Sequence, residues 1–300
     1  MTSIPSLSPE AAREQKRPGR MSTLQELRRR PSGLFGLAIV LLLLFAVVFA
    51  PWIAPYNYRQ QDIKNRLEGP SASHVLGTDQ LGRDLFSRLI YGARVALSVA
   101  IPAVLLAVIA GLILGLLAGF FGGWIDNGIV VLLDTIQAFP AVILALAFLA
   151  LLGSSTTNII LVIALAFTPG YARVVRSQVL SIRENLYIEA ERSLGASPFR
   201  LVMVHILPNI IAPLFILMAM DLPGAIGIEA GLSFLGLGVK PPIPSWGSIL
   251  ADGFVKIRNS PWAVIWASLT LMIVTLGVTL FGEALRDILD PRLAGSTRKQ

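Results

Sequence analysis

The 300-residue sequence contains no cysteine, only two histidines and few charged residues. The absence of cysteine excludes disulfide bonds, thiolate catalysis and cysteine metal sites. His74 and His205 lie far apart in the sequence, so a histidine-rich metal centre is not expected either. Charged residues make up 14% of the chain, whereas a typical soluble domain has about 25%. This deficit of charge indicates a membrane protein.

Catalytic motifs are also missing from the sequence. It has five lysines, and none of them lies in a Gly-x4-Gly-Lys-Ser/Thr phosphate-binding loop. Neither the Gly-x-Ser-x-Gly nucleophile elbow nor the His-Glu-x-x-His zinc motif occurs. We therefore expect a chain that is not an enzyme and that binds no metal and no cofactor of its own.

Apolar residues, by contrast, form several long continuous runs. Hydrophobic residues make up 54% of the chain, and the mean hydropathy is +0.70. A helix needs roughly 20 apolar residues to cross a bilayer, whereas a transmembrane β-barrel shows alternating segments of about 10 residues. The continuous runs therefore predict an all-α polytopic membrane protein with six transmembrane helices. These are expected over residues 34–53, 95–121, 129–152, 159–168, 210–236 and 261–281.

Features in and next to these runs predict local structure. Gly111, Gly115 and Gly119 recur every four residues, which places them on one helix face and predicts close packing against a neighbouring helix. Asp134 lies within the third run, where its carboxylate is expected either to face the bundle interior or to reach the nearby membrane surface. Residues 81–91 fit an interfacial amphipathic helix or an ordinary connecting loop equally well.

The distribution of basic residues predicts the orientation of the chain. Lysine and arginine number 25 against 18 acidic residues, which gives a net charge of +7. Sixteen of the basic residues fall in the two tails and in a polar loop near the middle, and eight fall in the two polar segments on the opposite side. Because cytoplasmic loops are enriched in basic residues, both termini are expected in the cytoplasm. The same bias explains the basic composition, so no nucleic-acid partner is expected.

Met1 and Met21 are both candidate start residues. The predicted topology divides the chain into four segments. The segments are a cytoplasmic tail at 1–31, a first helix with an outside segment at 32–94, a five-helix core at 95–285 and a second cytoplasmic tail at 286–300.

The polar loop at residues 171–209 carries the clearest local signals. Asn185 is a good N-cap and Gly195 a good residue for the position after a helix end, so together they bracket a short helix. Ser197 can cap a second helix that has Pro198 at its first position. The loop therefore predicts two short helices outside the membrane.

The predicted limits of this loop are two prolines. Pro169-Gly170 is expected to break the fourth span, and Pro208 is expected to turn the chain into the fifth. On the first short helix, Leu186, Ala190 and Leu194 fall on one face. This arrangement predicts an exposed helix on a stalk, suited to a rigid contact with a soluble partner.

The spacing within this loop resembles the EAA motif of ABC importer permeases. Glu189-Ala190-Glu191 is followed by Gly195 and then by Ile206-Leu207-Pro208, with Glu191 standing where the family usually has alanine. Four further blocks resemble the second, C-type membrane subunit of dipeptide and oligopeptide permeases. They are HVLGTDQLGRD at 74–84, LSFLGLG at 232–238, PPIPSWG at 241–247 and LRDILDPR at 285–292, so the resemblance covers about residues 28–293.

This resemblance implies a type I ABC importer permease fold in a bacterial inner membrane, surrounded by lipid. The implied partners are a paralogous permease subunit that completes a heterodimer, two cytoplasmic subunits that bind ATP and Mg²⁺, and an extracytoplasmic solute-binding protein. The chain would form half of a pathway for dipeptides or oligopeptides. Among relatives of this kind the cargo includes dipeptides, oligopeptides, glutathione, nickel complexes and opines, and the sequence does not choose among them.

The resemblance also implies site residues. Asp221 and Glu229, polar members of the fifth span, are candidate pathway residues, although helix packing explains them equally well. The coupling helix that docks on an ATPase subunit would comprise Glu189, Ala190, Glu191, Arg192, Ser193, Leu194, Gly195 and Ala196. Candidate contacts to the binding protein are Pro241, Pro242, Ser245 and Trp246.

Two other classes of protein compete with this interpretation. Asp134, Asp221, Glu229 and Glu283 lie within or at the ends of spans, as in a proton-coupled secondary transporter. Such transporters usually contain internal repeats, and none is visible here. A membrane enzyme is disfavoured because the sequence shows no nucleophile–base pair and no metal constellation.

Overall fold

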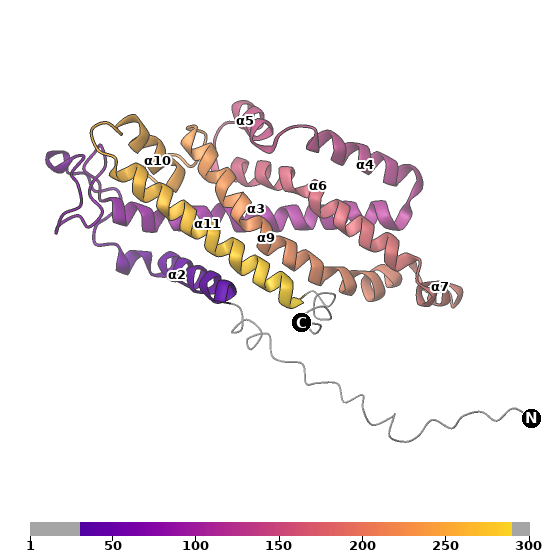
Figure 1. Cartoon of the computed structure of the whole chain (residues 1–300). Coiled ribbons are helices and arrows are strands. Elements are labelled where there is room, and N and C mark those ends of the chain that lie inside the picture. The colour runs from indigo at the N-terminus through magenta and orange to yellow at the C-terminus, as the bar shows by residue number, and fades with distance from the viewer. Residues whose placement is uncertain (1–30, 290–300) are drawn as a thin grey trace, which may run out of the picture.

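The computed structural model describes residues 31–289, so the N-terminal tail, Met21, most of the C-terminal tail and part of the 285–292 block lie outside the described residues. In the described part of the chain every regular element is helical, which confirms the predicted all-α class. The longest helices lie side by side in one bundle (Figure 1). The principal helices are α2 (Pro31–Ile53), α3 (Leu85–Phe121), α4 (Gly123–Gln137), α5 (Ala141–Leu152), α6 (Thr156–Arg183), α7 (Leu186–Ser193), α9 (Leu207–Phe234), α10 (Trp246–Val255) and α11 (Trp262–Leu289).

Five helices among the described residues are long and apolar enough to cross a membrane, and α4 with α5 makes a sixth if the pair counts as one span. The two helices of that pair meet at an angle of 88°. The expectation of one helix over 129–152 is therefore wrong. Pro140 explains the break, because it lacks a backbone N–H and disfavours a helical conformation in the residue before it.

Helix α3 begins ten residues before the predicted start of the second span. The Asp84 side chain caps it by accepting a hydrogen bond from the Ser87 N–H at 2.8 Å. Residues 85–91 are its first turns, so of the two alternatives for 81–91 the helix that leads into the membrane is correct from Leu85 on, while residues 81–84 precede it. Arg88 does not face water, as an interfacial helix would require, because it is buried beneath α10.

Helix α6 continues through Pro169-Gly170, so the break expected there is wrong. A proline inside a membrane helix is tolerated where neighbouring helices hold the segment in place, and α6 packs along the length of α3. The expected turn at Pro208 is also absent. The short helix α8 (Pro198–Arg200) leads through a π-helical segment, Leu201–Ile206, directly into α9.

The contact between α3 and α6 confirms the glycine prediction. A Cβ atom at Gly115 would stand 2.6 Å from the Ala172 carbonyl oxygen, and one at Gly119 would stand 2.7 Å from the Val179 Cβ. Glycine at these positions lets the two backbones approach more closely than any side chain would allow. The first 13 residues of the polar loop are therefore the end of a helix that is fastened to α3.

Helix α2 packs against α11 and α3. Pro51 lies inside α2 and has no N–H to donate to the Val47 carbonyl, four residues earlier. Arg94 of α3 supplies the missing donor: its Nε lies 2.6 Å from the Val47 oxygen and its Nη2 lies 3.2 Å from the Val48 oxygen. A side chain from one helix thus completes the hydrogen bonding of another.

Candidate functional site

Helix α7 projects from one end of the bundle, directly after α6 (Figure 1). Gly195 has a φ of +84°, a conformation that glycine adopts without strain. Its N–H donates to the Arg192 carbonyl at 3.0 Å, and the Ala196 N–H donates to the Glu191 carbonyl at 3.0 Å. These two bonds form a Schellman motif. The predicted stop of the helix at Gly195 is confirmed.

The two residues predicted to precede the short helices of this loop, Asn185 and Ser197, occupy the N-cap positions of α7 and α8. Asn185 occupies the N-cap of α7, although its side-chain amide instead donates to the carbonyls of Ser181 and Ile182, at 3.2 and 3.0 Å. Ser197 caps α8 by accepting a hydrogen bond from the Arg200 N–H at 3.3 Å. The loop therefore folds as two short helical elements that follow the end of α6.

The outer face of this region is apolar and exposed. Leu186 is 82% exposed, Leu194 85% and Phe199 71%. Ile188 is the buried residue of α7. Exposed apolar patches mark interaction sites. Since the predicted face of Leu186, Ala190 and Leu194 lies entirely at the surface, it is available to a partner.

Glu191, which departs from the EAA pattern, faces the π-helical segment. Its Oε1 lies 3.9 Å from the Nε2 of His205, and the rings of Tyr187 and His205 lie 6.1 Å apart. Glu191, which stands where the family usually has alanine, therefore lies next to His205 of the same chain. The other residues of the predicted coupling helix are exposed or half-buried along the same surface: Glu189, Ala190, Arg192, Ser193, Leu194, Gly195 and Ala196.

Three of the five arginines in the polar loop fasten α6 to its neighbours. Arg176 binds Asp126 of α4 through two bonds, of 2.5 and 2.6 Å. Arg173 pairs with Asp134 at 2.6 Å. The Arg183 guanidinium donates to the carbonyls of Gly119 and Phe120, at 3.3 and 3.4 Å. Asp134 is thus an exposed carboxylate that is paired with arginine.

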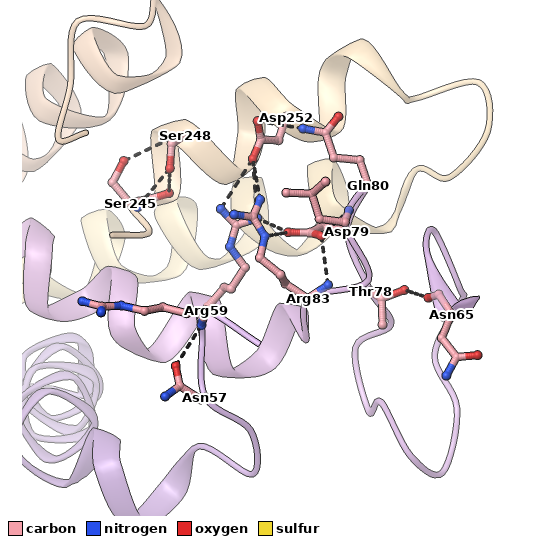
Figure 2. A network of polar contacts seen from close by, with 12 residues as sticks. Asn57, Arg59, Asn65, Thr78, Asp79, Gln80, Arg83, Ser245, Ser248 and Asp252 are labelled. Carbon is pink, nitrogen blue, oxygen red and sulfur yellow. Dashed lines mark hydrogen bonds and ion pairs between the residues drawn. The ribbon is translucent and has the colours of Figure 1, made fainter. Parts of the chain in front are cut away.

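A buried ionic cluster (Figure 2) lies near α10, at the end of the bundle opposite α7 (Figure 1). Asp79 accepts hydrogen bonds from Arg83, at 2.6 Å, and from Arg88. Asp252 of α10 lies 3.2 Å from Nη2 of Arg83 and 3.4 Å from Nη2 of Arg88. The two guanidinium groups therefore join the segment before α3 to α10. No sequence signal predicts this contact, because Asp252 is 169 residues from Arg83.

The segment between α9 and α10 is packed against the same end. The Trp246 indole donates to the Leu89 carbonyl at 2.9 Å, and Ser245 forms a capping box with Ser248 at the start of α10. Trp246 is 1% exposed and Ser245 is fully buried. Both are candidate contacts to a binding protein, and neither side chain lies at the surface in this structure. Pro241 and Pro242 are exposed.

The two candidate pathway residues have different surroundings on α9. Asp221 is half-buried, and Tyr171 of α6 lies near it. Glu229 is fully buried and accepts a hydrogen bond from the Ser233 hydroxyl at 2.7 Å. Eight residues of helix separate them by about 12 Å, so the structure does not bring the two carboxyl groups together. Among the described residues, no group of three or more acidic, histidine or cysteine side chains could hold a metal ion.

Comparison with known proteins identifies the family. Residues 111–295 match the family described as binding-protein-dependent transport system inner membrane component, and residues 21–70 match the N-terminal TM domain of oligopeptide transport permease C. The chain is 40% identical over 269 residues to the dipeptide transport system permease protein DppC of Alkalihalophilus pseudofirmus, covering 90% of this chain and 88% of that protein. It is 39% identical over 272 residues to the glutathione transport system permease protein GsiD of Shigella flexneri, covering 90% of each.

The fold also resembles a solved structure. The MetNI methionine ABC transporter in an inward-facing conformation superimposes with a TM-score of 0.54 at 20% identity, covering 68% of this chain and 97% of that one. The chain belongs to the family of binding-protein-dependent transport system inner membrane components, and it is a permease subunit of an ABC transporter. Its predicted resemblance to the dipeptide and oligopeptide permeases is confirmed. The alternative of a proton-coupled secondary transporter is not supported.

Proposed function

We propose that this chain forms half of the pathway of an importer for dipeptides or oligopeptides and that α7 couples the pathway to a separate ATPase subunit. The observation that carries the proposal is the exposed apolar face of α7, with Leu186 and Leu194 more than four-fifths exposed. This face lies at one end of the bundle and within the EAA spacing. A rigid helix that ends in a Schellman motif is suited to transmit force from a docked partner.

The full complex would contain a paralogous permease subunit, two ATP-binding subunits and a solute-binding protein. ATP and Mg²⁺ would bind to the ATPase subunits, because this sequence has no phosphate-binding loop. The distribution of basic residues supports placing α7 and both termini on the cytoplasmic side of a bacterial inner membrane. The ionic cluster and α10 would then face the binding protein.

Single cysteines test this arrangement sharply, because the chain has none of its own. Cysteine at Ala190 or Ser193 should crosslink to an ATPase subunit in the assembled complex, and cysteine at Pro241 should not. The proposal fails if the purified chain, expressed with its companion subunits, brings down no ATPase. It also fails if the α7 cysteines crosslink to the binding protein.

The tip of the segment before α10 is the proposed contact to the binding protein. Pro241 and Pro242 are exposed there, and Ile243 is 42% exposed. Labelling of a cysteine at Ile243 should fall when the loaded binding protein docks, whereas labelling at Ser193 should not change. Unchanged labelling at both positions would argue against contact at this tip.

The cargo is proposed to be a peptide because the similar proteins are named as dipeptide, peptide and glutathione permeases. Mass spectrometry of the ligand retained by the cognate binding protein identifies it directly, and a retained metal complex or sugar would contradict the proposal. Asp221 and Glu229 remain pathway candidates. If Asp221 lines the pathway, Asp221→Asn should change the preference among peptides of different charge, and a uniform loss of uptake would indicate a packing role instead.

A further inference from the structure

Most residues of α4 are exposed or half-buried. Leu133 is its buried residue. Its outer face carries Trp124, 82% exposed, and Val131, 65% exposed. It lies alongside α6 and leads, through the 88° bend, into α5 (Figure 1). Besides the packing of α4 against α3 and α6, two ionic contacts join it to α6.

The two ionic contacts of α4 differ in geometry and burial. Arg176 and Asp126 form a bidentate pair with bonds of 2.5 and 2.6 Å, and their side chains are 33% and 15% exposed. Asp126 also lies in the first turn of α4, where the helix dipole favours a negative charge. A bidentate arginine–carboxylate pair is strong and fixes the orientation of both groups.

The second contact resembles the first in chemistry but not in environment. Arg173 and Asp134 make a single bond of 2.6 Å, and their side chains are 48% and 57% exposed. Exposed pairs of this kind contribute little, because water and salt screen them. The chain thus offers a matched comparison between two arginine–aspartate pairs that join the same two helices.

Helix α6 is placed to pass movement from α7 to α4. It ends at Arg183, three residues before α7 begins, and Gly115 and Gly119 bring α3 into backbone contact with it. We propose that the Arg176–Asp126 pair is a positioning element of transport, which makes α4 and α5 follow α6 when a partner moves α7. This inference rests on the proposed coupling role of α7.

The test uses the complete complex in proteoliposomes and measures the number of ATP molecules hydrolysed per cargo molecule imported. Asp126→Asn and Arg176→Gln should each raise this ratio several-fold, because ATP hydrolysis continues while α4 no longer follows α6. The matched controls Asp134→Asn and Arg173→Gln should leave the ratio near that of the wild type. An unchanged ratio in both Asp126→Asn and Arg176→Gln would overturn the proposal.

A covalent replacement of the pair separates a mechanical role from a structural one. The double variant Asp126→Cys/Arg176→Cys introduces the only cysteines of the chain, and a short bifunctional thiol reagent can rejoin α4 and α6. Before crosslinking, the double variant should hydrolyse several-fold more ATP per imported cargo molecule than the wild type. After crosslinking, this ratio should return close to the wild-type value. If crosslinking restores nothing, the pair is not a mechanical link, even where the single variants assemble poorly. If the wild-type complex is purified without ATPase subunits, the coupling role of α7 itself is refuted instead.

Discussion

The Trp246 indole donates a hydrogen bond of 2.9 Å to the main-chain carbonyl of Leu89, which joins α10 to α3 across 157 positions of sequence. Gly92, almost one turn further along α3, makes room for the ring, since a Cβ there would stand 2.7 Å from Cδ1 of Trp246. Trp246, a candidate for contact to the binding protein, thus anchors α10 to α3.

Replacing this anchor should destabilise the protein. Trp246→Ala should lower the free energy of unfolding by about 3–5 kcal/mol, the usual loss when a large buried aromatic side chain is removed. Thermal unfolding of the purified protein in detergent measures the change. Trp52→Ala is the control, because Trp52 is 77% exposed and should contribute little. Equal effects of the two changes would show that burial of Trp246 does not determine its contribution.

Gly195 provides a test of the helix stop. Gly195→Val should abolish transport while membrane insertion continues, because valine at a φ of +84° is strained by roughly 1–2 kcal/mol. A Cβ at this position would meet no heavy atom within 4 Å, so the effect is conformational and not a clash. Gly195→Asn should retain much of the uptake, since asparagine tolerates this conformation. Normal uptake by the valine variant would contradict the coupling role.

The glycines of α3 and α6 predict opposite effects of the same substitution. Gly115→Ala places a methyl group 2.6 Å from the Ala172 carbonyl oxygen and should destabilise the protein by about 1–3 kcal/mol through overpacking. Gly170→Ala has open space around its methyl group and should stabilise α6 by up to about 1 kcal/mol. The two melting temperatures should therefore move in opposite directions. A shift of both in the same direction would contradict the packing described for α3 and α6.

The ionic cluster predicts a graded response to charge removal. Asp79 is 2% exposed and bonds both arginines, so Asp79→Asn should lower the free energy of unfolding by about 3–5 kcal/mol, as expected when a buried pair loses one partner. Asp252→Asn should lower it less, because the Asp252 side chain is 31% exposed. Unfolding measured at several salt concentrations should show little screening of the Asp79 effect. If Asp252→Asn lowered the free energy of unfolding more than Asp79→Asn, the prediction that the more buried aspartate contributes more would be wrong.

Much of the helical architecture is predictable from the sequence. Long apolar runs, the N-cap positions of Asn185 and Ser197 and the stop at Gly195 are local signals. The structure places helices or helix ends at each of them, except that the run at 129–152 is broken at Pro140 and Asn185 makes no side-chain cap. The spacing of Gly111, Gly115 and Gly119 correctly predicts a close helix contact because glycine at one helix face has a direct steric consequence.

The prolines show where local reasoning fails. Pro169 was expected to break a span and does not, because packing against α3 outweighs the loss of one hydrogen bond in α6. Ser245 and Trp246 looked like surface residues of a polar segment, and tertiary contacts bury them. The pairs Arg176–Asp126 and Arg83–Asp252 join residues 50 and 169 positions apart, a separation over which a single sequence has no periodicity to reveal a contact.

The bond between Arg94 and Val47 can be tested by a double-mutant cycle. Arg94→Met removes the donor for a carbonyl that Pro51 leaves unpaired, and it should cost about 1–3 kcal/mol. In a Pro51→Ala background the new N–H bonds the Val47 carbonyl, so Arg94→Met should cost less there. The cation–π contact of Arg94 with Tyr91, at 5.7 Å, is lost in both backgrounds and cancels in the cycle. An interaction energy near zero would contradict this assignment.

The same bond has a consequence for biosynthesis. Arg94 follows Val47 by 47 residues, so at a synthesis rate of roughly 5–20 residues per second the carbonyl waits about 2–9 s for its donor. An unpaired carbonyl in hydrocarbon is unfavourable by several kcal/mol, and an arginine entering the bilayer without acceptors is unfavourable as well. On insertion, α3 therefore supplies the donor that α2 lacks, and α2 supplies the acceptor for Arg94. The hydrogen bonding of α2 in the membrane is complete only after the start of α3 has been made.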